Sequence, residues 1–214
     1  MEIRWDWIDR HRADIESATL GHLKLTAISL AIAVALALPL ALAVRRRRVL
    51  AGFVVSLASL LYTIPSIALF GLLVPLIGLG SWPVIIGLVL YAQLTLLRNT
   101  LVGLEATPAP VREAAEGMGL TPRQLLFRVE LPLAIPAIVA GLRVTTVTAV
   151  GIATVGGLVG GGGLGQIIVD GVRRDFPTLI AVGAVCTTLL AVGLDLLILG
   201  VERATQPWLR AGRA

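Results

Sequence analysis

Side chains that could carry out catalysis are few in this sequence, and they are scattered along it. Glu113 and Glu116 lie three residues apart, so a helix would place both carboxylates on one face. No Ser-His-Asp arrangement accompanies them, and they suit an exposed contact surface better than a pocket. The single cysteine, Cys186, lies in an apolar run and cannot build a Cys/His metal site. The sequence predicts a protein that is not an enzyme and holds no cofactor or metal.

One carboxylate, Asp195, lies inside an apolar segment, where a charge is costly and is by default a functional candidate. A proton relay would need a second carboxylate or a histidine at similar depth, and we find none. His11 and His22 both fall at one expected interface, where they should be solvated. We therefore expect Asp195 to pair with Arg98 or Arg143, two cations in or near the membrane. If Arg143 is unpaired, its long side chain could extend to the inner membrane interface.

The longest polar interval in the middle of the chain is residues 113–132, EAAEGMGLTPRQLLFRVELP, between two apolar segments. Glycine readily adopts left-handed backbone, so a helix over the first residues should stop at Gly117 or Gly119. Thr121 and Gln124 form a capping box that would begin a second helix, and Pro132 and Pro136 should mark where it gives way to the next apolar run. We expect two short amphipathic helices, bent at Gly119 and held against a membrane.

Composition also indicates a membrane protein. Of 214 residues, 57% are hydrophobic and only 14% are charged, and mean hydropathy is +0.91. A net charge of +5 would suggest nucleic acid for a soluble helix-turn-helix protein. The arginines of the polar interval are offset by glutamates, which makes a poor phosphate-binding face, so we interpret the arginines as topology signals.

Long uncharged runs each reach the length of about 20 residues that a bilayer core requires. We expect an all-α, polytopic protein with an interfacial amphipathic segment at 1–22, a transmembrane domain over 23–201 and a tail over 202–214. Pro65 lies inside the second run and should kink or break it. The five expected spans are residues 25–44, 49–73, 83–104, 137–158 and 178–199.

A glycine-rich segment follows the fourth span. It contains no strand-preceded Gly-Lys-Ser/Thr sequence, so it is not a nucleotide-binding phosphate loop. The favoured interpretation is close helix packing and a turn at the outer face, and the alternative is a gate near a translocation path. The residues in question are Gly160, Gly161, Gly162 and Gly163.

The polar interval resembles a known motif. Glu113-Ala114-Ala115, Gly119 after three residues, Val129 after nine more, and then Leu131-Pro132 match the spacing of the EAA loop of ABC importer permeases, with Val129 where isoleucine is usual. The resemblance implies a type I importer permease whose cytoplasmic loop, here residues 105–136, docks into a cleft of a separate ATPase. It also implies that ATP and Mg²⁺ are bound by that ATPase, and that a separate extracytoplasmic solute-binding protein is a partner.

Other stretches resemble one branch of that family, the osmoprotectant permeases of bacteria, within a general plan similar to the methionine-importer permeases. The branch carries glycine betaine, carnitine, choline or proline betaine, whereas an amino-acid-class solute is the alternative. The stretches are Ile64–Leu69, Leu97–Thr100 and Gly160–Gly165.

Charge asymmetry predicts the orientation. With the EAA loop in the cytoplasm, twelve of the 18 Lys and Arg residues fall on the cytoplasmic side. We expect an outside N-terminus and a cytoplasmic C-terminus in the bacterial inner membrane. The twelve are Arg45–Arg48, Arg98, Arg112, Arg123, Arg128, Arg143, Arg203, Arg210 and Arg213.

Five helices are too few to enclose a solute path, so we expect a paired permease, most simply a homodimer in the lipid bilayer facing two ATPases. Tyr62, Phe70 and Tyr91 are the aromatic residues placed to face a path, with Pro65 and Ser66 at a weak transient site. Three rings are too few for a tight quaternary-ammonium cage, so selection should rest with the binding protein. A secondary transporter is disfavoured by the scarcity of intramembrane charges. A scaffold would leave the EAA spacing unexplained.

Overall fold

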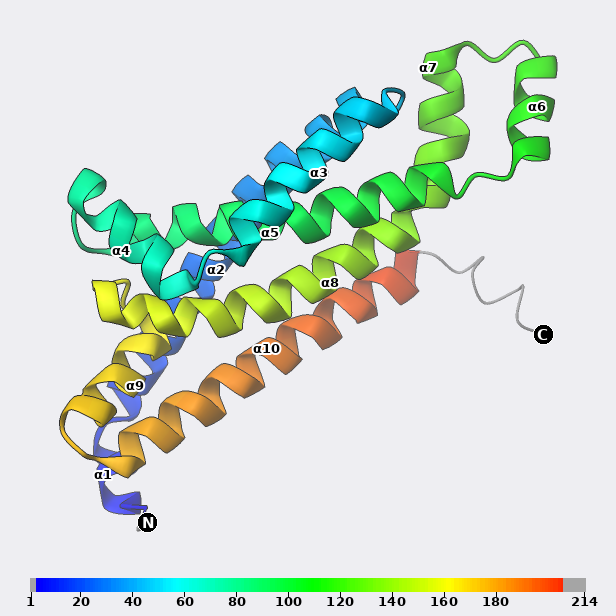
Figure 1. The fold of residues 1–214 in the computed structure, drawn as a ribbon. Helices are drawn as coiled ribbons and strands as arrows, with labels where there is room; N and C mark the ends of the chain where they lie inside the picture. The colour runs from blue at the N-terminus through cyan, green and yellow to red at the C-terminus, as the bar shows by residue number, and fades with distance from the viewer. Residues whose placement is uncertain (1–2, 206–214) are drawn as a thin grey trace.

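A computed structural model describes residues 3–205, which fold into helices joined by short turns (Figure 1). The all-helical prediction is confirmed for this part of the chain. The α-helices are α1 Trp5–Arg10, α2 Arg12–Val44, α3 Arg48–Thr63, α4 Ser66–Ile77, α5 Ser81–Glu105, α6 Ala109–Gly117, α7 Pro122–Leu125, α8 Leu131–Val155, α9 Gly163–Arg173 and α10 Pro177–Thr205. A π-helix, η1, covers Leu126–Glu130, and a 3-10 helix, η2, covers Gly156–Val159.

Within residues 3–205, four helical stretches are long and apolar enough to cross a membrane: α2, α5, the continuous stretch from α7 to η2, and α10. A fifth crossing is available if α3 and α4 are counted as one span, because together they pass the same test. The pair is bent by 93° at Ile64 and Pro65, which both have extended backbone. The break lies where Pro65 predicted it, since proline lacks the N–H that would continue the helix.

The core forms around α5, which lies between α2 and α8. Close approach of α5 and α8 depends on small residues: a Cβ on Gly103 would lie 2.9 Å from the Ala137 Cβ, and one on Gly141 would lie 2.6 Å from the Asn99 Cβ. Such small-residue contacts let two backbones approach within a membrane, where burial of apolar groups supplies little driving force between helices. Fully buried apolar side chains around α5 include Ala33, Ala37, Phe70, Val84, Leu88, Leu97 and Val150.

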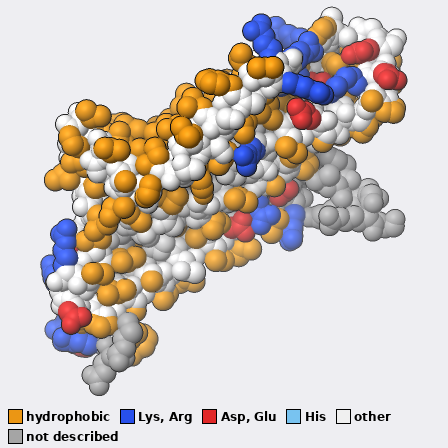
Figure 2. Space-filling view, in the orientation of Figure 1, with side chains coloured by type: hydrophobic (Ala, Val, Ile, Leu, Met, Phe, Trp, Pro, Cys, Tyr) orange, Lys and Arg blue, Asp and Glu red, His pale blue; other side chains and the backbone are white. Residues whose placement is uncertain are grey.

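The two ends of the bundle differ. At one end lie the α2–α3 turn with its arginines, α6 and α7, and the C-terminal end of α10 (Figure 1). The other end carries α1, the α4–α5 turn and α9. Lys and Arg side chains gather toward both ends, with a broad apolar surface between them (Figure 2). This distribution suits a helix bundle that crosses a bilayer from end to end.

The segment expected to lie flat at the interface, residues 1–22, is divided. Only α1 is separate, because α2 begins at Arg12 and continues through the first apolar run as one helix of 33 residues, about 50 Å long. The Trp7 ring packs within the chain: it stacks on His11, with centroids 4.2 Å apart, and meets Phe176 edge-on at 5.7 Å.

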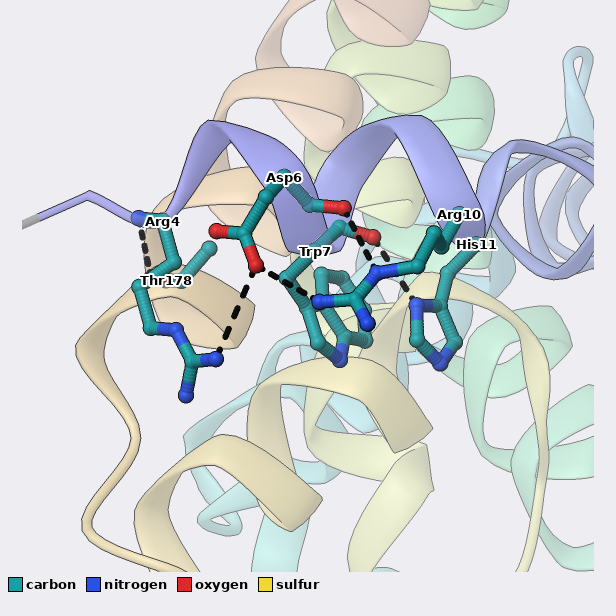
Figure 3. A network of polar contacts seen from close by, with 6 residues as sticks. All are labelled: Arg4, Asp6, Trp7, Arg10, His11 and Thr178. Carbon is teal, nitrogen blue, oxygen red and sulfur yellow. Dashed lines mark hydrogen bonds and ion pairs between the residues drawn. The ribbon is translucent and has the colours of Figure 1, made fainter.

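One hydrogen bond joins the N-cap of α1 to the start of α10, and the other polar contacts drawn lie within the N-terminal segment (Figure 3). The Arg4 backbone N–H donates to the Thr178 hydroxyl at 3.1 Å, and Asp6 accepts from Arg10 at 2.6 Å. The His11 Nδ1 donates to the Trp7 carbonyl at 2.8 Å. The N-terminal segment is therefore part of the bundle end.

Pro132 does not end a helix, contrary to expectation. The helix that begins at Pro122 continues through η1 and α8, with Pro136 inside it. Pro132 is the second residue of α8, directly after the π-helix η1, where the change from i→i+5 to i→i+4 hydrogen bonding can accommodate a missing N–H. The expected loop 105–136 therefore contains the first turns of the fourth span. The tail residues Arg210 and Arg213 lie outside the described residues.

Candidate functional site

The motif residues Glu113, Ala114 and Ala115 lie on α6, which projects beyond the end of the bundle (Figure 1). Glu113 and Ala114 are exposed, and Ala115 is the only buried residue of α6. A short amphipathic helix that buries one alanine and exposes its remaining faces is available to a partner. Contacts at the C-terminal end of α6 and at Arg112 hold the helix in place, although α6 buries no residue besides Ala115.

Gly119 makes the turn after α6. Its φ is +80°, a left-handed conformation that glycine adopts without a Cβ penalty. Its N–H donates to the Glu116 carbonyl at 2.9 Å, and the Leu120 N–H donates back to the Ala115 carbonyl at 3.2 Å, which closes the helix end. No atom lies within 4 Å of the position that a Cβ on Gly119 would take. Space around Gly119 is therefore open within the described chain.

The second helix begins at the capping box that the sequence predicts. The Thr121 hydroxyl accepts from the Gln124 N–H, and the Gln124 side chain accepts from the Thr121 N–H at 2.8 Å. One turn of α7 then passes into η1 and α8, so Leu131 and Pro132 lie where the loop enters the membrane helix. The motif thus holds α6 beside a rigid extension of the fourth span.

Arg45, Arg112 and Glu130 form a group of ion pairs at α6, which we call the Glu130 cluster. Glu130, at the end of η1, is 4% exposed and bonds Arg45 through its Oε2. Its Oε1 lies 3.4 Å from a guanidinium nitrogen of Arg112 on α6. Beside the cluster is a cleft of about 710 Å³, lined also by Arg46, Arg48, Leu104, Glu105, Glu116, Leu120, Pro122 and Leu125. The sequence pattern assigned Glu130 no role beyond balancing charge.

The residues expected along a solute path separate into two groups. Tyr62 and Tyr91 lie edge to face with centroids 5.6 Å apart, next to the break at Pro65 and Ser66. The Tyr91 hydroxyl donates to the Ile64 carbonyl at 2.6 Å, which satisfies an acceptor that the break has freed. Tyr62 is 41% exposed, so it is available to a path, whereas Tyr91 is 5% exposed.

Phe70 does not face a path. Its side chain is fully buried, and a Cβ on Gly87 of α5 would lie 2.4 Å from its ring. The expectation for Phe70 is wrong because the 93° bend turns α4 so that this ring packs onto α5.

The glycine-rich segment lies at the end of the bundle opposite α6. Gly160, Gly162 and Gly163 have positive φ, and Gly161 donates to the Gly156 carbonyl at 2.9 Å. Nearby, the Gly80 N–H donates to the Val159 carbonyl at 2.9 Å, which joins this segment to the α4–α5 turn. These contacts fit the packing interpretation of the segment, and the role of a gate stays a prediction.

Asp195 on α10 pairs with Arg143 on α8 through two parallel contacts, Nε to Oδ1 at 2.8 Å and a second guanidinium nitrogen to Oδ2 at 2.9 Å. Two-point contact of this kind orients both side chains. Arg98, the other expected partner, lies on α5 and donates to the Ser59 hydroxyl at 3.3 Å. The pair joins the fourth and fifth spans.

Comparison with known proteins gives the family. Residues 23–211 match the family described as the binding-protein-dependent transport system inner membrane component. The chain belongs to this family. The permease is 36% identical over 189 residues to the choline transport system permease protein OpuBB of Bacillus subtilis, covering 88% of this chain and 87% of that one. It is 42% identical over 165 residues to the glycine betaine/carnitine/choline transport system permease protein OpuCD of the same organism, covering 77% and 72%.

A solved structure agrees with the fold. The inward-facing MetNI methionine ABC transporter contains a chain with 25% identity and a TM-score of 0.70, covering 87% of the permease and 95% of that chain. The permease is therefore a multi-pass inner-membrane component of an ABC importer, with an ATPase and a solute-binding protein as partners, and it is not itself catalytic. Membership excludes the alternatives of a DNA-binding protein and a secondary transporter.

His22 is the clearest residue that sequence reasoning misplaced. It is 1% exposed, and its Nε2 donates to the Val150 carbonyl of α8 at 3.0 Å. A Cβ on Gly163 would lie 3.0 Å from the His22 Cα, so α9 also packs against this residue. His22 is structural, because it lies inside the long α2 helix instead of at a solvated helix start.

Replacing Asp195 with leucine is expected to lower the melting temperature of the permease in detergent. The change leaves Arg143 without its partner inside a spanning helix, where an unpaired cation is unfavourable. Asn at position 195 should retain transport, since the pair has a structural role. Loss of transport in Asp195→Asn with an unchanged melting temperature would contradict this and favour a proton relay. The exchange Arg143→Asp with Asp195→Arg is the matched control and should recover stability.

Proposed function

We propose that this permease imports a quaternary ammonium compatible solute such as glycine betaine, carnitine or choline. The observation that carries the proposal is the identity of 36% and 42% with two permeases named for these solutes, over more than 70% of each chain. ATP and Mg²⁺ are bound by the ATPase, and the permease contributes the path and the docking surface. An amino acid is the second candidate solute, supported by the likeness to the methionine transporter.

The docking surface is the exposed side of α6 with the Gly119 turn and the start of α8. Glu113, Ala114 and Gly119 are exposed, while Leu131 and Pro132 fix the base of the loop on the fourth span. An exposed short helix that is held at both ends suits insertion into a cleft of a partner, because little reorganisation accompanies binding.

The path is formed between two copies of the permease. Tyr62, just before the 93° bend, is exposed, and α3 and α4 carry apolar side chains that are open to their surroundings, including Phe53, Leu57, Leu60, Ile67 and Leu72. Two copies facing each other through this surface would bring two Tyr62 rings to one path. This is the basis for the homodimer in the bilayer.

Solute selection belongs to the binding protein. Tyr62 is the one ring of the Tyr62–Tyr91 pair that is substantially exposed, and a single ring per copy cannot enclose a trimethylammonium group. The purified permease alone should therefore bind radiolabelled betaine or choline only weakly. Binding at micromolar or tighter Kd, about −8 kcal/mol, would place the selective site in the permease and contradict this division.

Orientation can be tested by labelling. We propose an outside N-terminus, since the Arg45–Arg48 turn lies at the same end of the bundle as α6. In a Cys186→Ser background, Val49→Cys should resist an impermeant maleimide added outside cells, and Ser81→Cys should label. Both positions are exposed in the structure, so burial does not bias the comparison. The opposite pattern would invert the topology and remove the cytoplasmic docking role of α6.

A further inference from the structure

The Glu130 cluster joins three parts of the permease that are far apart in sequence. Arg45 caps the end of the first spanning helix, α2, and lies 85 residues before Glu130. Arg112 lies on α6, one residue before the motif. Glu130 itself ends the π-turn from which the fourth span continues. A single carboxylate therefore contacts the first span, the exposed helix and the base of the fourth span.

The cluster is one of few internal contacts that hold α6. Ala115 is the only buried residue of α6, and the cleft of about 710 Å³ separates α6 and α7 from the arginines of the α2–α3 turn. Apolar side chains do not fill this cleft, so a displacement of α6 cannot reach α2 through packing there. The two ion pairs, Arg112–Glu130 and Glu130–Arg45, connect the two sides of this cleft.

The ion pairs of the Glu130 cluster are placed so that a displacement of α6 reaches α2. The side chains of Glu130 and Arg45 are 6% and 12% exposed, so the pair is protected from the solvent screening that weakens surface ion pairs. The Arg112 end is more open, at 42%. Removing the carboxylate would leave two guanidinium groups facing each other in a partly closed space, and they would separate. A π-turn adjoins the carboxylate, and such turns are frequent at functional sites.

We propose that Glu130 is a positioning residue that couples the position of α6 to the first spanning helix during transport, a role that rests on the proposed docking of α6 on the ATPase. When the ATPase moves α6, Arg112 moves with it, and Glu130 passes that displacement to Arg45 and α2. Without Glu130 the ATPase still docks on the exposed surface of α6. Its hydrolysis then responds more weakly to solute arriving from the other side of the membrane.

The test uses the complete complex of permease, ATPase and binding protein in lipid nanodiscs. The readout is the stimulation ratio, which is ATP hydrolysis with choline-loaded binding protein divided by hydrolysis without it. We expect Glu130→Gln to retain the bound ATPase and the unstimulated rate, and to lower the ratio about fivefold. Arg45→Gln and Arg112→Gln should lower it in the same way, and the double variant Arg45→Gln/Glu130→Gln should be no worse than either single variant.

Glu105→Gln is the matched control, since Glu105 lines the same cleft and has no ion pair within residues 3–205. Its stimulation ratio should equal that of the wild type. A normal ratio in Glu130→Gln, or losses that add in the double variant, would overturn the proposal. If Glu130→Gln does not assemble, a wild-type ratio in both assembled arginine variants overturns it equally. Failure of the wild-type permease to bind its ATPase would instead refute the proposed function.

Discussion

A Gly119→Asp variant is expected to insert and fold normally and to lose transport, by about tenfold or more. A Cβ at this position would meet no atom of the described chain within 4 Å apart from its sequence neighbours, so the space next to Gly119 is open. Aspartate also tolerates the left-handed backbone that the φ of +80° requires. Any large effect must therefore come from a surface that approaches Gly119 from outside, which is the ATPase in this account. A loss of this size corresponds to about 1.4 kcal/mol.

The measurements are ATP-driven uptake, the amount of ATPase that co-purifies, and the elution profile of the permease in detergent. Gly119→Ala is the control for the backbone, because alanine at positive φ costs about 1 kcal/mol while adding only a methyl group. Alanine should reduce uptake much less than aspartate. Normal uptake and normal ATPase binding in Gly119→Asp would show that Gly119 does not approach the partner.

Gly165→Ala is expected to destabilise the permease strongly. The added Cβ would lie 2.3 Å from the Thr154 carbonyl oxygen, where α9 crosses the end of α8. The neighbouring atoms are backbone, so relief requires the helices to move apart, at a cost of about 1–3 kcal/mol. A lower melting temperature in detergent, together with reduced yield from the membrane, is the expected result.

Gly193→Ala on α10 is the matched control for this change. It lies inside a helix, and no atom is within 4 Å of its Cβ position. Alanine favours a helix over glycine by about 1 kcal/mol, so this variant should melt at the wild-type temperature or slightly above it. If Gly165→Ala has the same melting temperature as Gly193→Ala, the glycine-rich segment is not held by close packing.

Local features of the structure could be predicted from the sequence because their causes are local. Runs of uncharged residues predicted the spanning helices, Pro65 predicted the break, and Thr121 with Gln124 predicted the capping box. The prediction for Pro132 was wrong because a proline does not always end a helix. The π-helix η1 precedes Pro132 and lets the helix continue into α8, and no residue type in the sequence indicates a π-helix.

Contacts between distant segments could not be predicted in the same way. His22 was expected to be solvated at the outer interface, yet α2 begins ten residues earlier and α8 and α9 cover it. The sequence left two partners open for Asp195, and only the packing of α10 on α8 selects Arg143. Glu130 could not be recognised, since the arginine it bonds most closely lies 85 residues away.

The most direct test of quaternary ammonium import by this permease is ATP-driven uptake into proteoliposomes. These contain the permease and its ATPase, with the solute-binding protein present on the outer side. We expect radiolabelled choline, carnitine or glycine betaine to accumulate only when ATP is inside and the binding protein is present, and Gly119→Asp to lower this accumulation by about tenfold or more. Methionine serves as the comparison solute. Uptake of methionine without uptake of any quaternary ammonium solute would contradict the proposed solute class, and uptake that persists without ATP would contradict the ABC importer mechanism itself.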